Sequence, residues 1–376
     1  MYLGIDTSAY TTSAAVVDDV PACLWEKRQL LEVPLGDYGQ AQSKSFFQHT
    51  VSLPSVLAEM PSEYWPRLKG IGVSVSPRSV EGSYMPVFRA GVSLARVLAQ
   101  ALAIPLMETS HQEGHIMAGL WSAGLWPEGL QSEEPETERQ ASEGSQLKGL
   151  GTKRGRSIER TEESSAAGRF LAFHISGGTT EILRVTSDTE GGWGTEIIGN
   201  TQDLHAGQFV DRVGVSLGLP FPAGPYLAEL SAKGSRDAET LLPSSVKKGV
   251  VSFSGVESAA QRLIAQKTVP PDVARAVEGC CLRSFAKMIE YAIDETGLDR
   301  VLMIGGVAAN EFLRARLPAR VARGCFYWAQ ERWSSDNACG TALMALRRLR
   351  TREKFRMADD IEALSEDLKE YMENGQ

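Results

Sequence analysis

Two histidines four residues apart are the residues of this sequence best suited to bind a metal ion. His111 and His115, in His-Gln-Glu-Gly-His, would lie about 40° apart around an α-helix, so both imidazoles can reach one ion. The glutamate stands one position later than in the HExxH motif, which argues against a metalloprotease. A pair of capping or surface histidines is the alternative. A third ligand must come from elsewhere, and Asp336, in Ser-Ser-Asp-Asn, is the best-placed acid.

Two polar turns have the composition of a phosphate-binding loop. Residues 176–180 (Ser-Gly-Gly-Thr-Thr) offer backbone N–H groups that no side chain shields, together with three hydroxyls. Residues 6–8 (Asp-Thr-Ser) supply an acid and hydroxyls at the matching place in the first half. Facing turns of this kind could hold the phosphates of a nucleotide, and two ordinary hairpin turns are the alternative. Neither GxGxxG nor GxxxxGK[ST] occurs, which excludes the Rossmann and P-loop modes.

Two further segments could contact a flat ligand or a ribose. Residues 305–310 (Gly-Gly-Val-Ala-Ala-Asn) follow an apolar run, and Asn310 either contacts a ligand or caps the next helix. Asp211 is followed by Phe-Pro-Ala-Gly-Pro at 221–225. Its carboxylate either accepts hydrogen bonds from ribose hydroxyls or forms a salt bridge with Arg212.

The elements that must position these residues form two similar halves. Apolar runs predict a β-hairpin at the start of each half, at 2–6 with 13–18 and at 170–175 with 181–186. Further patterns predict strands at 70–76 and 300–304, and helices at 90–103, at 272–296 and after Gly306 to about Arg323. This repetition indicates an α/β protein of two related lobes.

Length and charge narrow the class of protein. A chain of 376 residues fits two domains. Its net charge of −8 excludes nucleic-acid binding by bulk electrostatics. Any RNA contact would therefore be a local basic patch, for which one helical segment supplies candidates; a solvated helix face is the slightly favoured alternative. The candidates are Arg314, Arg316, Arg320 and Arg323.

Five cysteines without a CxxC pair, and no signal peptide or membrane span, predict a soluble, cytoplasmic protein.

The expected organisation has four parts. Residues 1–126 form an N-terminal lobe, and residues 170–350 form a C-terminal lobe with closing helices. Between them, 127–169 is polar and is expected to be a disordered insertion. Residues 351–376 form an acidic tail with a helical pattern.

Taken in order, these motifs resemble those of the N(6)-L-threonylcarbamoyladenine synthase family, TsaD, long labelled O-sialoglycoprotein endopeptidase or M22 glycoprotease. The resemblance covers most of the chain outside the insertion and the tail. It rests on His-x-Glu-Gly-His at 111–115, Ser-Gly-Gly at 176–178, Gly-x-x-x-Asp-basic at 207–212, Pro-x-Gly-Pro at 222–225, Ser-Phe-Ser-Gly at 252–255, Gly-Gly-Val-Ala-Ala-Asn at 305–310 and Ser-Asp-Asn at 335–337.

The resemblance implies an actin/Hsp70-like ATPase fold, with two ribonuclease-H-like lobes and a cleft between them. It implies a transferase that moves a threonylcarbamoyl group from threonylcarbamoyl-adenylate to N6 of the adenosine next to the tRNA anticodon. The implied cofactors are one divalent metal, iron or zinc, and a bound adenylate, either threonylcarbamoyl-AMP or ATP. tRNA and proteins of the same pathway are the implied partners, and no membrane is involved.

The resemblance also assigns roles to single residues. The metal would be held by His111, His115 and Asp336. Substrate phosphates would be lined by His174, Ile175, Ser176, Gly177 and Gly178. The ribose and adenine would be held by Asp211, Gly224 and Asn310. Catalytic roles fall to Asp6 and Ser8 in the first turn.

Several positions depart from the family pattern. The family's first turn, Glu-Thr-Ser-Cys-Asp-Glu-Thr, reads Asp-Thr-Ser-Ala-Tyr-Thr-Thr at 6–12, so Tyr10 and Thr11 replace two acids. Ser-Gly-Gly-His-Thr has become Ser-Gly-Gly-Thr-Thr, Gln208 replaces an acid, and the Gly-Pro-Gly-Leu loop is Ser-Pro-Arg-Ser at 76–79. These changes favour a divergent paralogue. A catalytically inactive nucleotide-binding scaffold, or a partner of a true family member, is the alternative.

Overall fold

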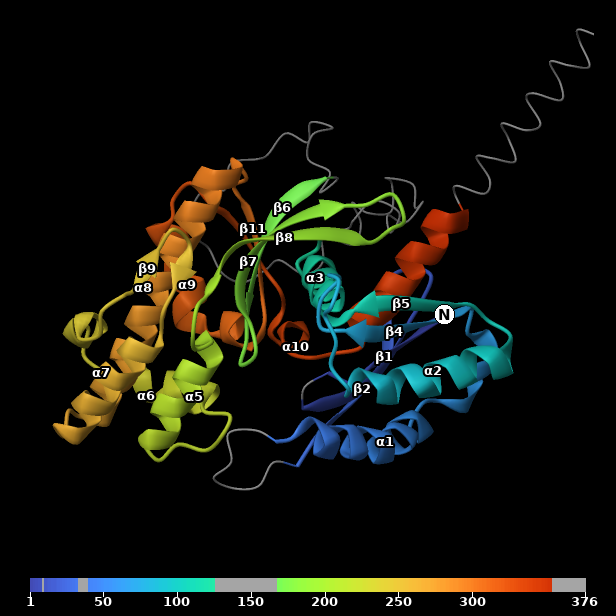
Figure 1. The fold of residues 1–376 in the computed structure, drawn as a ribbon, viewed down its shortest axis with the longest axis horizontal. Helices are drawn as coiled ribbons and strands as arrows, with labels where there is room; N and C mark the ends of the chain where they lie inside the picture. Colours follow the sequence, from blue (N-terminus) through green and yellow to red (C-terminus); the bar gives the residue numbers. More distant parts are fainter. Residues whose placement is uncertain (9, 33–39, 126–167, 354–376) are drawn as a thin grey trace, which may run out of the picture.

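A computed structural model describes residues 1–8, 10–32, 40–125 and 168–353 of the chain. Nearly all of the predicted insertion at 127–169, and most of the predicted tail at 351–376, lie outside the described residues. The described part contains two β-sheets with helices packed around and between them (Figure 1). No helix of this part is long and apolar enough to cross a membrane.

The first sheet has the strand order β3-β2-β1-β4-β5. Its strands are β1 (Tyr2–Asp6), β2 (Thr11–Val17), β3 (Cys23–Leu30), β4 (Gly70–Ser76) and β5 (Leu106–Ser110). β1 pairs antiparallel with β2 and parallel with β4. β1 and β2 are buried throughout, including the polar residues at the ends that face the turn between them.

The second sheet repeats this arrangement, in the order β12-β11-β6-β7-β8-β10-β9. Its strands are β6 (Arg169–Ile175), β7 (Thr180–Ser187), β8 (Trp193–Thr201), β9 (Val246–Lys247), β10 (Val250–Val251), β11 (Arg300–Ile304) and β12 (Cys325–Trp328). β6 pairs antiparallel with β7 and parallel with β11, as β1 does with β2 and β4. The predicted pair of hairpins and the two related lobes are therefore confirmed.

The helices lie close to their predicted positions, with one correction. They are α1 (Gln42–Ala58), η1 (Ser62–Arg67), α2 (Phe88–Leu102), α3 (His111–Ser122), α5 (Ala206–Ser216), α6 (Gly224–Ser231), η3 (Asp237–Thr240), α7 (Ser254–Ala265), α8 (Pro270–Thr296), η4 (Gly306–Ala309), α9 (Glu311–Arg320), α10 (Glu331–Ser334) and a helix over 339–353. The helix predicted to follow Gly306 begins later, after the short turn η4, and ends at Arg320. Asn310 caps it, one of the two roles left open for this residue, because its side chain accepts a hydrogen bond from Leu313 N.

Two helices lie between the sheets, and each packs on the sheet of the other half. α3 follows β5 of the first sheet, but Gly119 packs against Ile304 of the second sheet. The 339–353 helix follows β12 of the second sheet, yet it packs against Gly4 and Gly72 of the first. The two helices cross so closely that a Cβ atom on Gly340 would lie 1.9 Å from the carbonyl oxygen of Gly114. This exchange brings the His-Gln-Glu-Gly-His motif and the Ser-Asp-Asn motif together.

Candidate metal and nucleotide site

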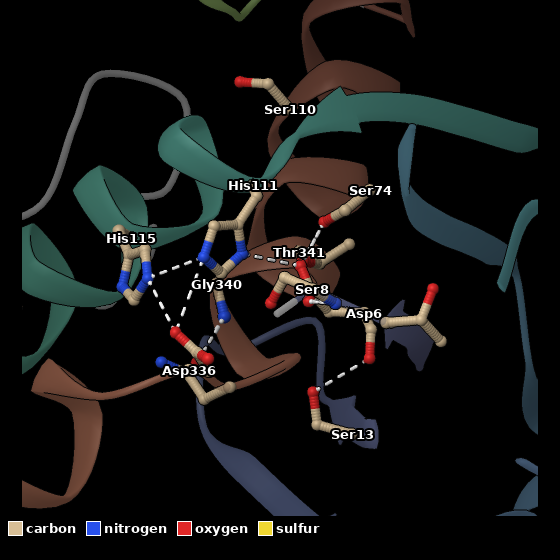
Figure 2. A network of polar contacts seen from close by, with 12 residues as sticks. Asp6, Ser8, Ser13, Ser74, Ser110, His111, His115, Asp336, Gly340 and Thr341 are labelled. Carbon is tan, nitrogen blue, oxygen red and sulfur yellow. Dashed lines mark hydrogen bonds and ion pairs between the residues drawn. The ribbon is translucent and has the colours of Figure 1, made fainter. Parts of the chain in front are cut away.

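The two histidines lie in the first two turns of α3 because a capping box starts this helix at His111. The Ser110 hydroxyl accepts a hydrogen bond from Glu113 N at 3.2 Å, and the Glu113 carboxylate accepts one from Ser110 N at 2.9 Å. His115 follows one turn later on the same side of the helix (Figure 2). The helical spacing predicted for this pair is observed.

His111, His115 and Asp336 come together with geometry that suits a cation. Their nearest ligand atoms lie within 4.8 Å of one another. The two histidine Nε2 atoms are 3.0 Å apart, and Asp336 Oδ1 lies 3.5 Å from His111 Nε2 and 3.4 Å from His115 Nε2 (Figure 2). Metal–ligand distances of about 2.0–2.1 Å give a tetrahedron with edges of about 3.3–3.4 Å. The three atoms therefore fit one face of a tetrahedral site with an open position.

Asp6 orients the first of these histidines. Its Oδ2 lies 3.0 Å from His111 Nδ1, so a proton on Nδ1 leaves Nε2 free to bind an ion. Ser74 donates to the same oxygen, and Ser8 N donates to Oδ1 at 2.8 Å. Asp6 is only 1% exposed. The structure thus makes Asp6 a positioning residue for His111, and a direct role of Asp6 or Ser8 in catalysis stays a prediction.

The charges of this cluster are strongly coupled. Burial opposes a charged imidazolium at His111, but the carboxylates of Asp6 and Asp336 outweigh it and raise the pKa of His111 to about 10. Burial, together with the charge of His111, lowers the pKa of His115. Although burial opposes it, the two histidines lower the pKa of Asp336. Two carboxylates beside two imidazoles form a site with an affinity for positive charge.

Next to the cluster are buried polar groups without a hydrogen-bond partner. The ring of His174, on β6, lies 4.7 Å from the ring of His115. Within the described part of the chain, neither ring nitrogen of His174 has a hydrogen-bond partner, and the same holds for the buried hydroxyl of Ser8. Burial, reinforced by the two neighbouring histidines, lowers the pKa of His174 well below its ordinary value. Unsatisfied buried polar atoms at one place indicate a site for a polar ligand.

The glycine turn after β6 leaves its backbone accessible. Gly177 and Gly178 are exposed, and a Cβ atom on either would meet no atom within 4 Å. Ser176 N donates to Thr179 O at 2.8 Å, which closes the turn. The side chain of Ile175 is fully buried in the second lobe, so only its backbone is available to a ligand. Gly178 N donates to Ser176 Oγ at 3.3 Å, and the binding of an anion by this turn stays a prediction.

The residues predicted to hold the ribose and adenine lie in the second lobe, where they also stabilise helix ends. Asp211 accepts a hydrogen bond from Ala223 N at 2.7 Å, directly before α6. Among the described residues it forms no salt bridge with Arg212, so that alternative is wrong. Burial raises the pKa of Asp211. Gly224, at the start of α6, has open space where a side chain would be.

Asn310 has the capping role that the sequence left open. Besides capping α9, its amide donates to the buried Glu278 carboxylate at 2.7 Å. Glu278 Oε2 also accepts from Ser231 Oγ, and burial raises the pKa of this carboxyl. A ligand at Asn310 would therefore contact a side chain that α6, α8 and α9 hold in place.

Two parts of the site are not among the residues predicted from the sequence. Glu113 accepts hydrogen bonds from Ser79 Oγ at 2.7 Å, from Arg348 at 2.8 Å and from Trp193 N at 3.3 Å, so it joins the elements around α3. The Ser-x-x-Glu spacing at 110–113 could have identified it as a capping residue.

The second missed feature is an ion pair between the lobes. Arg78, in the loop after β4, pairs with Glu181 on β7, which is 6% exposed. Glu181 lies directly across from His174 in the β6–β7 hairpin. No local sequence signal reveals this pair, because its members are 103 residues apart.

Three of the four arginines named as RNA candidates have internal partners. Arg314 donates to the carbonyl oxygens of Ala308 and Ala329, at 2.9 and 2.5 Å. Arg316 pairs with Glu239 through both carboxylate oxygens, and Arg323 pairs with Asp294 at 2.6 Å. These contacts favour a structural role for the helix face, and its contact with RNA stays untested.

Comparisons with known proteins agree with this architecture. A family model described as "TsaD: tRNA N6-adenosine threonylcarbamoyltransferase" matches residues 159–343. Full-length HypF in its phosphate- and nucleotide-bound form is similar at a TM-score of 0.51 and 12% identity, over 93% of this chain and 46% of that chain. HypF of T. kodakarensis gives a TM-score of 0.50 at 12% identity, over 94% and 48% of the two chains.

A further similar structure is component A of the (R)-2-hydroxyglutaryl-CoA dehydratase of Acidaminococcus fermentans. It has a TM-score of 0.49 and 14% identity, over 92% of this chain and 98% of that chain. The chain spans about half the length of the HypF structures it matches. At 12% identity the two HypF structures show the fold alone. With the strand order repeated in both sheets, the likeness to HypF confirms the actin/Hsp70-like ATPase fold.

Proposed function

Because the chain belongs to the TsaD family, we propose that it is a metal-dependent transferase acting on tRNA. It would move a threonylcarbamoyl group from threonylcarbamoyl-adenylate to N6 of the adenosine next to the anticodon. The observation that carries this proposal is the convergence of His111, His115 and Asp336 beside the unpartnered His174. The first two ligands come from one lobe and the third from the other, so the site lies where the lobes meet.

The transfer forms a bond between N6 and the carbamoyl carbon. It breaks the bond between that carbon and an oxygen of the adenylate phosphate, and so releases AMP and a proton. When bound, an iron or zinc ion would polarise an oxygen of the substrate and offset the charge of the departing adenylate. Asp6 would keep His111 in the tautomer that leaves Nε2 free to bind such an ion. The N–H groups of Gly177 and Gly178 would bind the phosphate oxygens.

The remaining binding residues would orient the nucleotide. Asp211 would accept hydrogen bonds from the ribose, and Asn310, held by Glu278, would contact the adenine side. Gly224 leaves room for the nucleotide to approach α6. These assignments follow the family resemblance and agree with the positions of the three residues in the second lobe.

A reconstituted reaction tests the proposal. Purified protein is incubated with ATP, threonine, bicarbonate, the adenylate-forming enzyme and unmodified tRNA, with pathway partner proteins added in a second series. Mass spectrometry of the digested tRNA should show threonylcarbamoyl-adenosine. An Asp336→Ala variant serves as the matched control and should yield none. Absence of the product with wild-type protein and all partners would remove the transferase proposal.

The proposed setting is the cytoplasm, with tRNA and proteins of the same pathway as partners. Because the chain carries a net charge of −8, tRNA would be bound at a local basic patch. Reversing the charge of Arg320 and Arg323 should then flatten the salt dependence of tRNA binding. An unchanged slope would place the contact elsewhere.

A nucleotide-binding scaffold without transferase activity is the second candidate. It is favoured by Tyr10 and Thr11, which stand where the family has two acids. Thr11 is buried in β2, and the Tyr10 carbonyl accepts a hydrogen bond from Leu31 N, so both positions have contacts that need no acid. If the protein binds AMP in calorimetry but gains activity only in a Tyr10→Asp, Thr11→Glu variant, the native chain is a scaffold.

A further inference from the structure

We propose that Arg28, on β3 of the first lobe, is a positioning residue for Asp336, the metal ligand contributed by the second lobe. This inference rests on the metal site of the proposed function. Asp336 lies in a short connection between α10 and the 339–353 helix that has no regular secondary structure. Its position relative to His111 and His115 therefore depends on the side chains that hold this connection.

Arg28 holds the connection directly before Asp336. Its Nη1 donates to the hydroxyl of Ser335 at 3.0 Å, and its Nη2 donates to the carbonyl oxygen of Arg332 at 2.7 Å. The partners are more than 300 residues away in sequence. A planar guanidinium that donates to two acceptors at once fixes both their separation and their orientation.

Arg28 is itself fixed by an acid and an aromatic ring. Glu26, only 4% exposed, accepts from Arg28 Nε at 2.5 Å and from Arg332 Nη2 at 3.1 Å. The guanidinium carbons of Arg28 and Arg332 lie 5.6 and 4.6 Å from the centre of the Trp333 ring. A buried carboxylate between two guanidinium groups, both stacked near one indole, leaves Arg28 little freedom.

The same cluster reaches the helix that carries the histidines. Trp333 packs edge-to-face on Trp121 of α3, with ring centres 5.2 Å apart. Directly after Asp336, the Asn337 amide donates to Ser335 O at 2.9 Å and accepts from Gly340 N at 3.1 Å. Arg28 and Asn337 thus both contact Ser335, the residue before Asp336.

Zinc affinity of the full chain, measured by calorimetry after removal of metal with a chelator, tests the role of Arg28. Arg28→Ala should bind Zn²⁺ about 10- to 100-fold more weakly, the usual effect of losing a group that orients a metal ligand. Glu26 keeps its pairing with Arg332 in this variant, so the metal-free protein should unfold close to the wild-type temperature. Ser335→Ala, which removes an exposed hydroxyl and leaves the Arg28–Glu26 pair intact, should weaken zinc binding in the same direction but less.

Arg96→Ala is the matched control, because it removes an exposed ion pair with Glu108 in the same lobe. It should leave zinc affinity unchanged. Wild-type affinity in both Arg28→Ala and Ser335→Ala would overturn the positioning role. A wild type that binds no Zn²⁺ would overturn the metal site together with this role. A wild type that binds Zn²⁺ but does not modify tRNA would overturn the transferase proposal alone, since the two zinc affinities still decide the role of Arg28.

Discussion

Replacing Asp6 by asparagine should weaken metal binding although Asp6 is not among the three converging ligands. The two carboxylate oxygens of Asp6 accept three hydrogen bonds, from Ser8 N, Ser74 Oγ and His111 Nδ1. Asparagine has one oxygen and one NH₂ group. If the oxygen faces His111, the NH₂ group points at the N–H of Ser8. If the NH₂ group faces His111, the proton of that imidazole moves to Nε2, the atom that should bind the ion.

Either arrangement destabilises the metal-bound state. Loss of such an orienting carboxylate lowers metal affinity about 10- to 100-fold, which is about 1.4–2.7 kcal/mol. With zinc at a hundred times the wild-type Kd, the ion stabilises the native wild-type protein by about 2.7 kcal/mol, whereas a hundredfold weaker variant retains only about 0.4 kcal/mol. The zinc-induced rise in the unfolding temperature should therefore shrink by a few degrees.

The assay is thermal unfolding with and without Zn²⁺, together with calorimetric titration. Asp19→Asn, which changes a carboxylate of the same lobe that pairs with Lys69 far from the histidines in sequence, is the control and should keep the full zinc response. An Asp6→Asn variant with wild-type zinc affinity would refute the orienting role derived for Asp6.

Three further results are expected. Asp336→Ala should lose most bound metal in elemental analysis, while His205→Ala should keep about one ion per chain; equal metal content would contradict the ligand set. Arg78→Gln strips the buried Glu181 of its ion pair and should lower the free energy of unfolding by about 1–3 kcal/mol, and additive losses with Glu181→Gln in a double-mutant cycle would contradict their coupling. Burial raises the pKa of Glu278 in the folded protein. The contribution of this carboxyl to stability is therefore present below its ordinary pKa and is lost as the pH rises through its pKa in the folded protein. The free energy of unfolding of the wild type, relative to that of Glu278→Gln, should rise as the pH falls from 7 to 5.

The strands and most helices could be predicted because their signals are local. Apolar runs on both sides of polar turns identified the hairpins of β1–β2 and β6–β7, and prolines at 270 and 271 marked the start of α8. The start of α9 was left open, because the sequence allows Asn310 either to cap the next helix or to contact a ligand. Local spacing does not distinguish these outcomes, whereas the observed bond from Leu313 N to Asn310 identifies the cap.

The candidate site divides in the same way. The spacing of His111 and His115 predicts a shared ion from one helix, but the choice of Asp336 gained its support from the family resemblance, since no local pattern relates residues 225 positions apart. The exchange of α3 and the 339–353 helix between the two sheets is what brings them together, and it requires glycines where the helices cross. Asp6 and Arg28 act through long-range hydrogen bonds to His111 and Ser335. Metal-ligating residues can be recognised from residue type and spacing. The residues that orient them are identified only from the three-dimensional structure, because they are distant in sequence.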